Sequence, residues 1–235
     1  MKRLLVILLL VPQLTWGAMD FNGSTGKATA SAVEVSAAPM SISCWGNSDS
    51  ATASQTAVSI SDTATDVQNL YVNWGGTAIG DPIRVVSDST SAGVASSSSG
   101  YTISTWHHSA GVWTSSASRA AFIDGGSKGT ETTDLSPSSL DTTGIGVLAR
   151  LNQGGFFDGR LAECGIWNVA LTDDEVATLA RGFAPPCVRR ASLLAYYPMI
   201  RDTTTLKDLF SATANNLTLA GTTAVADHPR VINCQ

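Results

Sequence analysis

Short stretches of β-type residues, separated by polar turns, recur along most of the sequence. They occupy residues 40–45, 69–74, 83–86, 101–113, 119–123, 145–148 and 156–167. The segments between them are rich in Gly, Asp, Ser and Thr, which end strands and form turns. In residues 69–74, Leu70, Val72 and Trp74 fall on one face, as a half-buried strand requires. The pattern predicts an all-β sandwich, with the Ser-rich residues 87–100 as an exposed loop.

One short helix is expected near residue 172. Thr172 and Glu175 have the spacing of a capping box, and Asp173 and Asp174 suit the positive end of a helix dipole. Gly182 follows as a stop signal. These acidic residues therefore have a structural role that requires no metal.

The N-terminus has the features of a signal peptide. Lys2 and Arg3 precede a short apolar run, and small Gly17 suits cleavage before Ala18. The run is shorter than the roughly 20 apolar residues that a spanning helix needs. We therefore expect residues 1–17 to be removed, leaving a secreted or surface-displayed chain of residues 18–235 with no membrane span.

The charge of this mature chain argues against a nucleic acid partner. Loss of Lys2 and Arg3 leaves 12 basic against 19 acidic side chains, a net charge of −7. Nucleic acid binding needs basic side chains that displace counterions from phosphates. Only 14% of the full sequence is charged, so its surface is expected to be polar but largely uncharged.

Four cysteines remain in the mature chain: Cys44, Cys164, Cys187 and Cys234. Their wide spacing does not fit a zinc or thioredoxin-type motif. In an oxidising compartment they predict two disulfides, for which three pairings are possible.

Several segments together resemble laminin-G-like domains of the concanavalin A-like jelly-roll family. These segments are "WHHSAGVWTSSASRAAFIDG", "FFDGRLAECGIWNVALTDDEVATLARG", "MDFNGSTG" and "MSISCWG". The resemblance implies a two-sheet jelly-roll sandwich with one short helix after the core strands.

The order of one family segment is unusual. A stretch of the type "LLAYYPMIRDTTTLKDLFSATANNLTLAG", which precedes the Phe-x-Gly strand in many such domains, lies here at the C-terminal end. The chain is therefore interpreted as circularly permuted, with residues 186–235 completing a single domain of residues 18–235. The alternative is the truncated start of a second repeat, which would leave an apolar face uncovered.

The resemblance also implies a disulfide pairing and an ion site. Cys44 and Cys164 lie on strands expected to be neighbours, while Cys187 and Cys234 bracket the C-terminal segment. Related domains often hold calcium near the Asp-containing loop of this segment, where Asp208, Asn215 and Asn216 would supply oxygen ligands. An ordinary Asx-rich turn is the alternative for these three residues.

A laminarinase-type hydrolase on this fold would need two carboxylates flanking the scissile bond. Asp158 and Glu163 are the nearest candidates, but a separation of five residues places them on opposite faces of a regular strand. His107 and His108 also face opposite sides, and neither has an evident acidic partner in the sequence. The chain is accordingly not expected to be an enzyme.

The remaining functional class is binding. Sugar rings stack on aromatic side chains, and amide side chains bond their hydroxyls, so Tyr71, Asn73 and Trp74 are candidate ligand-binding residues. The predicted partner is a polysaccharide or glycoconjugate. A structural or adhesive surface or virion protein, which would contact other surface proteins, is the alternative, and a laminarinase-type hydrolase is the second.

Overall fold

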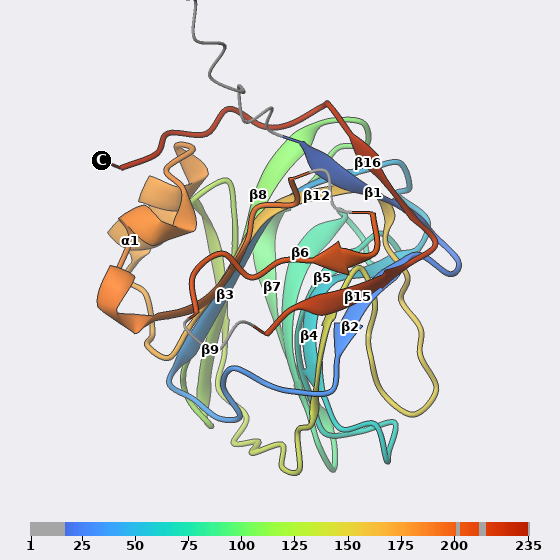
Figure 1. The fold of residues 1–235 in the computed structure, drawn as a ribbon. Helices are drawn as coiled ribbons and strands as arrows, with labels where there is room; N and C mark the ends of the chain where they lie inside the picture. The colour runs from blue at the N-terminus through green and yellow to red at the C-terminus, as the bar shows by residue number, and fades with distance from the viewer. Residues whose placement is uncertain (1–16, 201–202, 212–214, 235) are drawn as a thin grey trace, which may run out of the picture.

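The computed structural model describes residues 17–200, 203–211 and 215–234, and they form two antiparallel sheets packed face to face (Figure 1). This confirms the predicted all-β, concanavalin A-like sandwich with one short α-helix. The predicted signal peptide lies outside the described residues except for Gly17. No helix among the described residues is long and apolar enough to cross a membrane.

The first sheet contains the first and the last strand of the described residues, together with most of the family-like strands. Across the sheet the order is β10 (Gly126–Glu131), β9 (Ser118–Ile123), β8 (Trp106–Ser115), β3 (Met40–Ser48), β12 (Asp158–Trp167), β1 (Ala18–Asn22) and β16 (Thr222–Val225). β13 (Leu193–Tyr197) pairs with the second half of β12.

The second sheet is the other layer of the sandwich. Its order is β14 (Thr205–Leu206), β15 (Leu217–Ala220), β2 (Lys27–Ala30), β11 (Thr142–Ile145), β4 (Ser54–Ser61), β5 (Asn69–Gly75), β6 (Pro82–Asp88) and β7 (Ala92–Gly100). The prediction of an exposed loop over residues 87–100 was wrong, because β7 lies there and pairs with β6. Small Ala95 and Ser97 face inward on this edge strand, so it needs no large apolar side chain.

The core lies between the sheets and is built by alternation along the strands. Leu70, Val72 and Trp74 of β5 point into it and are almost fully buried. Phe21 and Leu161, from the two chain regions that meet as β1 and β12, are in the same cluster. Burial of such side chains is worth about 1.5 to 3 kcal/mol each.

The helix α1 (Asp173–Ala180) covers part of the outer face of the first sheet. The predicted capping box is present, since Thr172 and Glu175 each bind the other's backbone N–H. Buried Val176 and Leu179 pack with Trp167 in a second apolar cluster. The short 3₁₀ helices η1 (Pro185–Cys187) and η2 (Arg190–Ser192) then lead to β13.

The C-terminal segment contributes strands to both sheets. β15 pairs with β2, and β16 pairs with β1, whose first residue, Ala18, lies opposite Val225. The strands after residue 190 therefore bury their apolar side chains within the same sandwich that the N-terminal strands begin.

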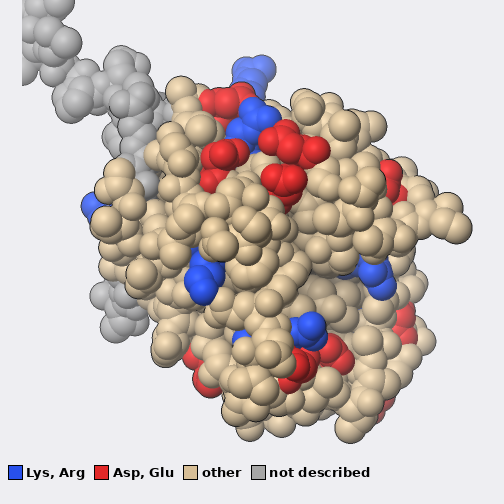
Figure 2. All heavy atoms as spheres, turned by 90° about the vertical axis from the view of Figure 1, so that its right-hand side faces the viewer, with Lys and Arg blue, Asp and Glu red and all other residues tan. Residues whose placement is uncertain are grey.

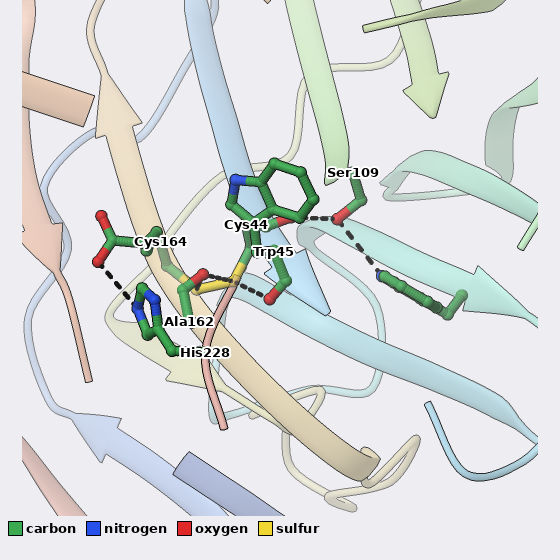
Figure 3. Close-up of a disulfide and its surroundings, with 8 residues drawn as sticks. Cys44, Trp45, Ser109, Ala162, Cys164 and His228 are labelled. Carbon is green, nitrogen blue, oxygen red and sulfur yellow. Dashed lines mark hydrogen bonds and ion pairs between the residues drawn. A yellow bond between two sulfur atoms is a disulfide. The ribbon is translucent and has the colours of Figure 1, made fainter. Parts of the chain in front are cut away.

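Both predicted disulfides are confirmed. Cys44 and Cys164 join β3 to β12 inside the sandwich, and Cys187 and Cys234 join η1 to the C-terminus. Figure 3 shows the first disulfide between its two strands, where Ser109 donates a hydrogen bond to the carbonyl oxygen of Cys44. The second disulfide is reinforced by the backbone hydrogen bond from Ile232 to Gly182.

Candidate functional site

The outer face of the second sheet carries Tyr71, the one of the three predicted ligand-binding side chains that is not buried. Tyr71 lies on β5 between Ser59 of β4 and Val86 of β6, and it is of intermediate exposure. Because side chains alternate along a strand, it points away from the core that its neighbours Leu70 and Val72 enter.

The prediction that Trp74 binds a ligand is wrong. Its side chain is fully buried, and its ring lies 4.7 Å from that of Tyr101 and 5.5 Å from that of Phe157, centroid to centroid. Its indole N–H donates to Ser109 Oγ. Trp74 is therefore part of the core, because it shares the inward face of β5 with Leu70 and Val72.

Asn73 is directed outward but is tied to the neighbouring strand. Its Oδ1 accepts a hydrogen bond from Ser54 Oγ at 3.1 Å, and its Nδ2 donates to the Gln55 carbonyl at 2.8 Å. Only 4% of Asn73 is exposed. Its side chain fixes β5 against β4 and leaves Tyr71 as the accessible member of the predicted set.

Charged groups border the Tyr71 ring. Burial raises the pKa of the Tyr71 hydroxyl, Asp88 raises it further, and Arg84 and Arg150 lower it. The hydroxyl is therefore neutral at ordinary pH and available as both donor and acceptor.

A loop of residues 146–157 crosses the outer face beside these strands. Ser59 Oγ donates to the Val147 carbonyl at 2.9 Å and accepts from the Ala149 N–H at 3.2 Å. Gly144 beneath it allows this close approach, because a Cβ at that position would lie 2.7 Å from the Ala149 Cβ. The loop divides the face into a Tyr71 side and a second side over β2 and β15.

On the second side lies a cavity of about 430 Å³ with an uncharged polar lining. Its lining includes Thr29, Ser31, Thr63, Thr142, Gln153 and Asn216. Lys27 Nζ donates to Gln153 Oε1 at 2.6 Å and holds this side chain at the cavity. Figure 2 faces the side of the molecule where the loop lies and shows mostly uncharged surface with charged side chains in a few groups. No pattern in the sequence indicated this cavity, because its residues meet only through the sheet order.

The residues predicted to bind calcium lie in the C-terminal segment, where Asn215 Nδ2 donates to Glu34 and the other two are hydrogen-bonded to each other. Asp208 Oδ1 accepts backbone hydrogen bonds from Tyr196, Phe210 and Ser211, and the Asp208 N–H donates to Asn216 Oδ1 at 3.0 Å. These hydrogen bonds are those of an Asx-type turn and occupy the Asn216 oxygen. Among the described residues, no group of three or more His, Cys, Asp or Glu side chains is arranged to hold a metal.

Histidine 107 has the acidic partner that the sequence did not reveal. His107 Nδ1 lies 2.7 Å from Asp124 Oδ2, across the β8–β9 hairpin. Its Nε2 accepts from the Thr102 N–H, so the proton of the neutral ring is on Nδ1. The pair joins the His of the Trp-His-His segment to the Asp of the Asp-Gly turn.

The regular alternation that was assumed for Asp158 and Glu163 does not hold along β12. β12 has a register shift between Ala162 and Gly165, and Glu163 has a φ of 54°, so simple alternation does not apply. Glu163 is 2% exposed, and its carboxylate accepts from the Tyr196 hydroxyl at 2.6 Å. His228 Nε2 lies 3.3 Å from the other oxygen (Figure 3). Glu163 is thus enclosed by the C-terminal segment.

Sequence comparison supports the fold and its family. A sequence profile of the concanavalin A-like lectin/glucanases superfamily matches residues 22–177, the larger part of the chain. The match ends at residue 177, before the C-terminal strands. No curated protein sequence matches the chain.

Solved structures with the same architecture include a heptameric SAP-like pentraxin from Limulus polyphemus. It is 14% identical with a TM-score of 0.63, over 92% of this chain and 97% of the pentraxin. Domain 4 of an extracellular arabinanase from Geobacillus stearothermophilus, in complex with arabinotriose, is 19% identical with a TM-score of 0.57, over 69% and 76% of the two chains. The CBM40 of the Ruminococcus gnavus IT-sialidase, bound to α2,3-sialyllactose, is 11% identical with a TM-score of 0.57, over 69% and 96%. At these identities the likeness concerns the fold.

Proposed function

The chain belongs to the concanavalin A-like lectin/glucanases superfamily, and from this premise we propose that it is a non-catalytic binding module for a carbohydrate. Domains of the same fold hold arabinotriose and sialyllactose in two of the similar structures. A shared fold does not assign a ligand, so the proposal depends on the surface of this chain.

The observation that carries the proposal is the composition of the outer face of the second sheet. Tyr71 offers an aromatic side chain and a neutral hydroxyl on one side of the 146–157 loop. On the other side the cavity offers hydroxyl and amide groups, among them those of Thr29 and Gln153. Sugar rings present apolar C–H faces and many hydroxyls, so this combination suits an uncharged glycan better than a charged ligand.

A non-catalytic role is supported by the state of Glu163, one of the two candidate catalytic carboxylates. Glu163 is enclosed and hydrogen-bonded to Tyr196, whereas a glycosidase acid must reach the glycosidic oxygen. Hydrolysis of a polysaccharide that is lost in Glu163→Gln would favour the laminarinase-type alternative.

We further propose that the mature chain acts outside the cell. The two disulfides support this location, because such bonds persist in oxidising compartments. A structural or adhesive role in a surface or virion assembly would use the same stable sandwich without a glycan.

The test is a glycan array with purified mature protein, followed by titration calorimetry with the best glycan. We expect retention of at least one class of neutral polysaccharide with weak single-site affinity that multivalent display raises. Failure to retain any glycan, together with self-association or binding to another surface protein, would favour the structural alternative.

A further inference from the structure

A second cavity, of about 420 Å³, lies between the segment after β2 and the C-terminal segment. Its lining includes Val33, Glu34, Leu194, Asp208, Ser211 and Asn215. It therefore combines apolar side chains with two carboxylates. No described residue in the lining is basic.

The Glu34 carboxylate is held in place by neutral donors. Its Oε1 accepts from the Tyr197 hydroxyl and from Asn215 Nδ2, both at 2.7 Å, and its Oε2 accepts from Thr143 Oγ1 at 2.7 Å. These bonds fix the carboxylate, but they bring no positive charge to it.

Asp208 supplies the second, independent observation. It is 6% exposed, and its Oδ1 accepts the three backbone hydrogen bonds of the turn. Its Oδ2 is buried and has no hydrogen-bond partner among the described residues. Buried carboxylate oxygens are normally satisfied, so an unpartnered oxygen on a residue that lines a cavity indicates a missing donor.

The Glu34 and Asp208 carboxylates both affect the pKa of Tyr197. Burial raises the pKa of the Tyr197 hydroxyl, and the Glu34 and Asp208 carboxylates raise it further. Their negative charges are therefore concentrated in one small region, where a positively charged ligand would gain from both.

We propose that this cavity binds an organic ammonium group, the protonated amine of an amino sugar, with Asp208 Oδ2 as its hydrogen-bond acceptor and Glu34 as its second counter-charge. An ammonium group brings the N–H donors that Asp208 Oδ2 lacks. The volume exceeds that of a bare ion, and Val33 and Leu194 offer apolar contact to the carbon ring that carries the amine. This site is separate from the Tyr71 face.

Calcium, predicted for Asp208, Asn215 and Asn216, is the rival occupant of this region. A calcium ion needs roughly six to eight oxygen ligands. Here Asn216 Oδ1 already accepts from the Asp208 N–H, and each Glu34 oxygen already accepts a hydrogen bond. A ligand that brings its own hydrogens fits this arrangement better than one that needs free oxygen atoms.

The experiment is a set of three titrations of the mature protein. The ligands are glucosamine, N-acetylglucosamine as the uncharged control of similar shape, and calcium chloride. We expect saturable binding of glucosamine and at least tenfold weaker binding of N-acetylglucosamine. Asp208→Asn retains an oxygen for the three backbone donors while removing the charge, and Glu34→Gln removes the other charge. Each variant should weaken glucosamine binding at least tenfold, whereas Asp174→Asn on the surface of α1 should not.

Two results would overturn the proposal. One is equal binding of the two sugars or no binding of glucosamine at millimolar concentration. The other is calcium binding that raises the melting temperature of the wild type but not of Asp208→Asn. If circular dichroism shows that Asp208→Asn does not fold, glucosamine binding by Glu34→Gln alone tests the proposal. Tyr71→Ala should leave glucosamine binding unchanged, so failure of the glycan proposal for the outer face is distinguishable from failure here.

Discussion

The hydroxyl of Tyr197 lies 2.7 Å from Oε1 of Glu34, although 163 residues separate them in the chain. The same hydroxyl lies 2.8 Å from the carbonyl oxygen of Asn215. The hydrogen bond between Tyr197 and Glu34 joins β13 to the segment after β2, and it positions one of the two carboxylates of the proposed ammonium site.

Replacing Tyr197 with Phe should lower the free energy of unfolding by about 1 to 3 kcal/mol, because Glu34 and Asn215 lose a buried donor. Chemical denaturation measures the effect. Tyr71→Phe is the matched control, since the Tyr71 hydroxyl makes no hydrogen bond among the described residues, and it should change stability little. Equal effects in the two variants would contradict a special role for the Tyr197 contact.

Removing the Cys187–Cys234 disulfide with the double substitution to Ser should lower stability by about 2 to 4 kcal/mol, because the bond closes a long loop. Thermal unfolding gives the loss, and peptide mapping without reduction should still find Cys44 joined to Cys164. A wild-type peptide that links Cys164 to Cys187 would contradict the pairing.

His108 should make the protein less stable in acid. Burial lowers its pKa from 6.5 to about 4, an effect that Asp124 partly opposes. Between these values the unfolded chain binds a proton that the folded chain does not, so the free energy of unfolding falls as the pH drops from 6.5 to 4, by at most about 3 kcal/mol. Denaturation across this range should show a smaller loss in His108→Phe. Identical pH dependence in both proteins would mean that other groups cause it.

Tyr71→Ala should weaken glycan binding about fivefold to tenfold, with little loss of stability, because aromatic contact contributes about 1 kcal/mol. Trp74→Ala should instead cost about 3 to 5 kcal/mol of stability, because it empties a core position. Ile103→Ala, at an exposed apolar residue elsewhere, is the binding control. If Tyr71→Ala binds the glycan with unchanged affinity, the binding site is instead the polar cavity over β2.

Exported protein should begin at Ala18, because the short apolar run and small Gly17 suit cleavage there. Intact-mass measurement on secreted material tests this. An intact Met1 end in exported protein would contradict the signal peptide.

The sequence by itself determined the features that depend on a few neighbouring residues. Alternation along residues 69–74 set which side chains of β5 enter the core, and the Thr172–Glu175 spacing set the start of α1. The family resemblance also indicated both disulfides, because it placed Cys44 and Cys164 on adjacent strands. These features are local, or follow from a strand order that the motifs identify.

Tertiary structure alone decided the contacts that depend on register, irregular strands and loop paths. Because β12 is irregular, the Glu163 side chain lies in an enclosed site beside His228. Simple alternation along the strand could not predict this position. Glu34 meets Tyr197 and Asn215 only because β13 and β15 return to the sandwich that β1 and β2 begin. No local pattern marks Glu34, since its role depends on which distant segments the strand pairing brings beside it.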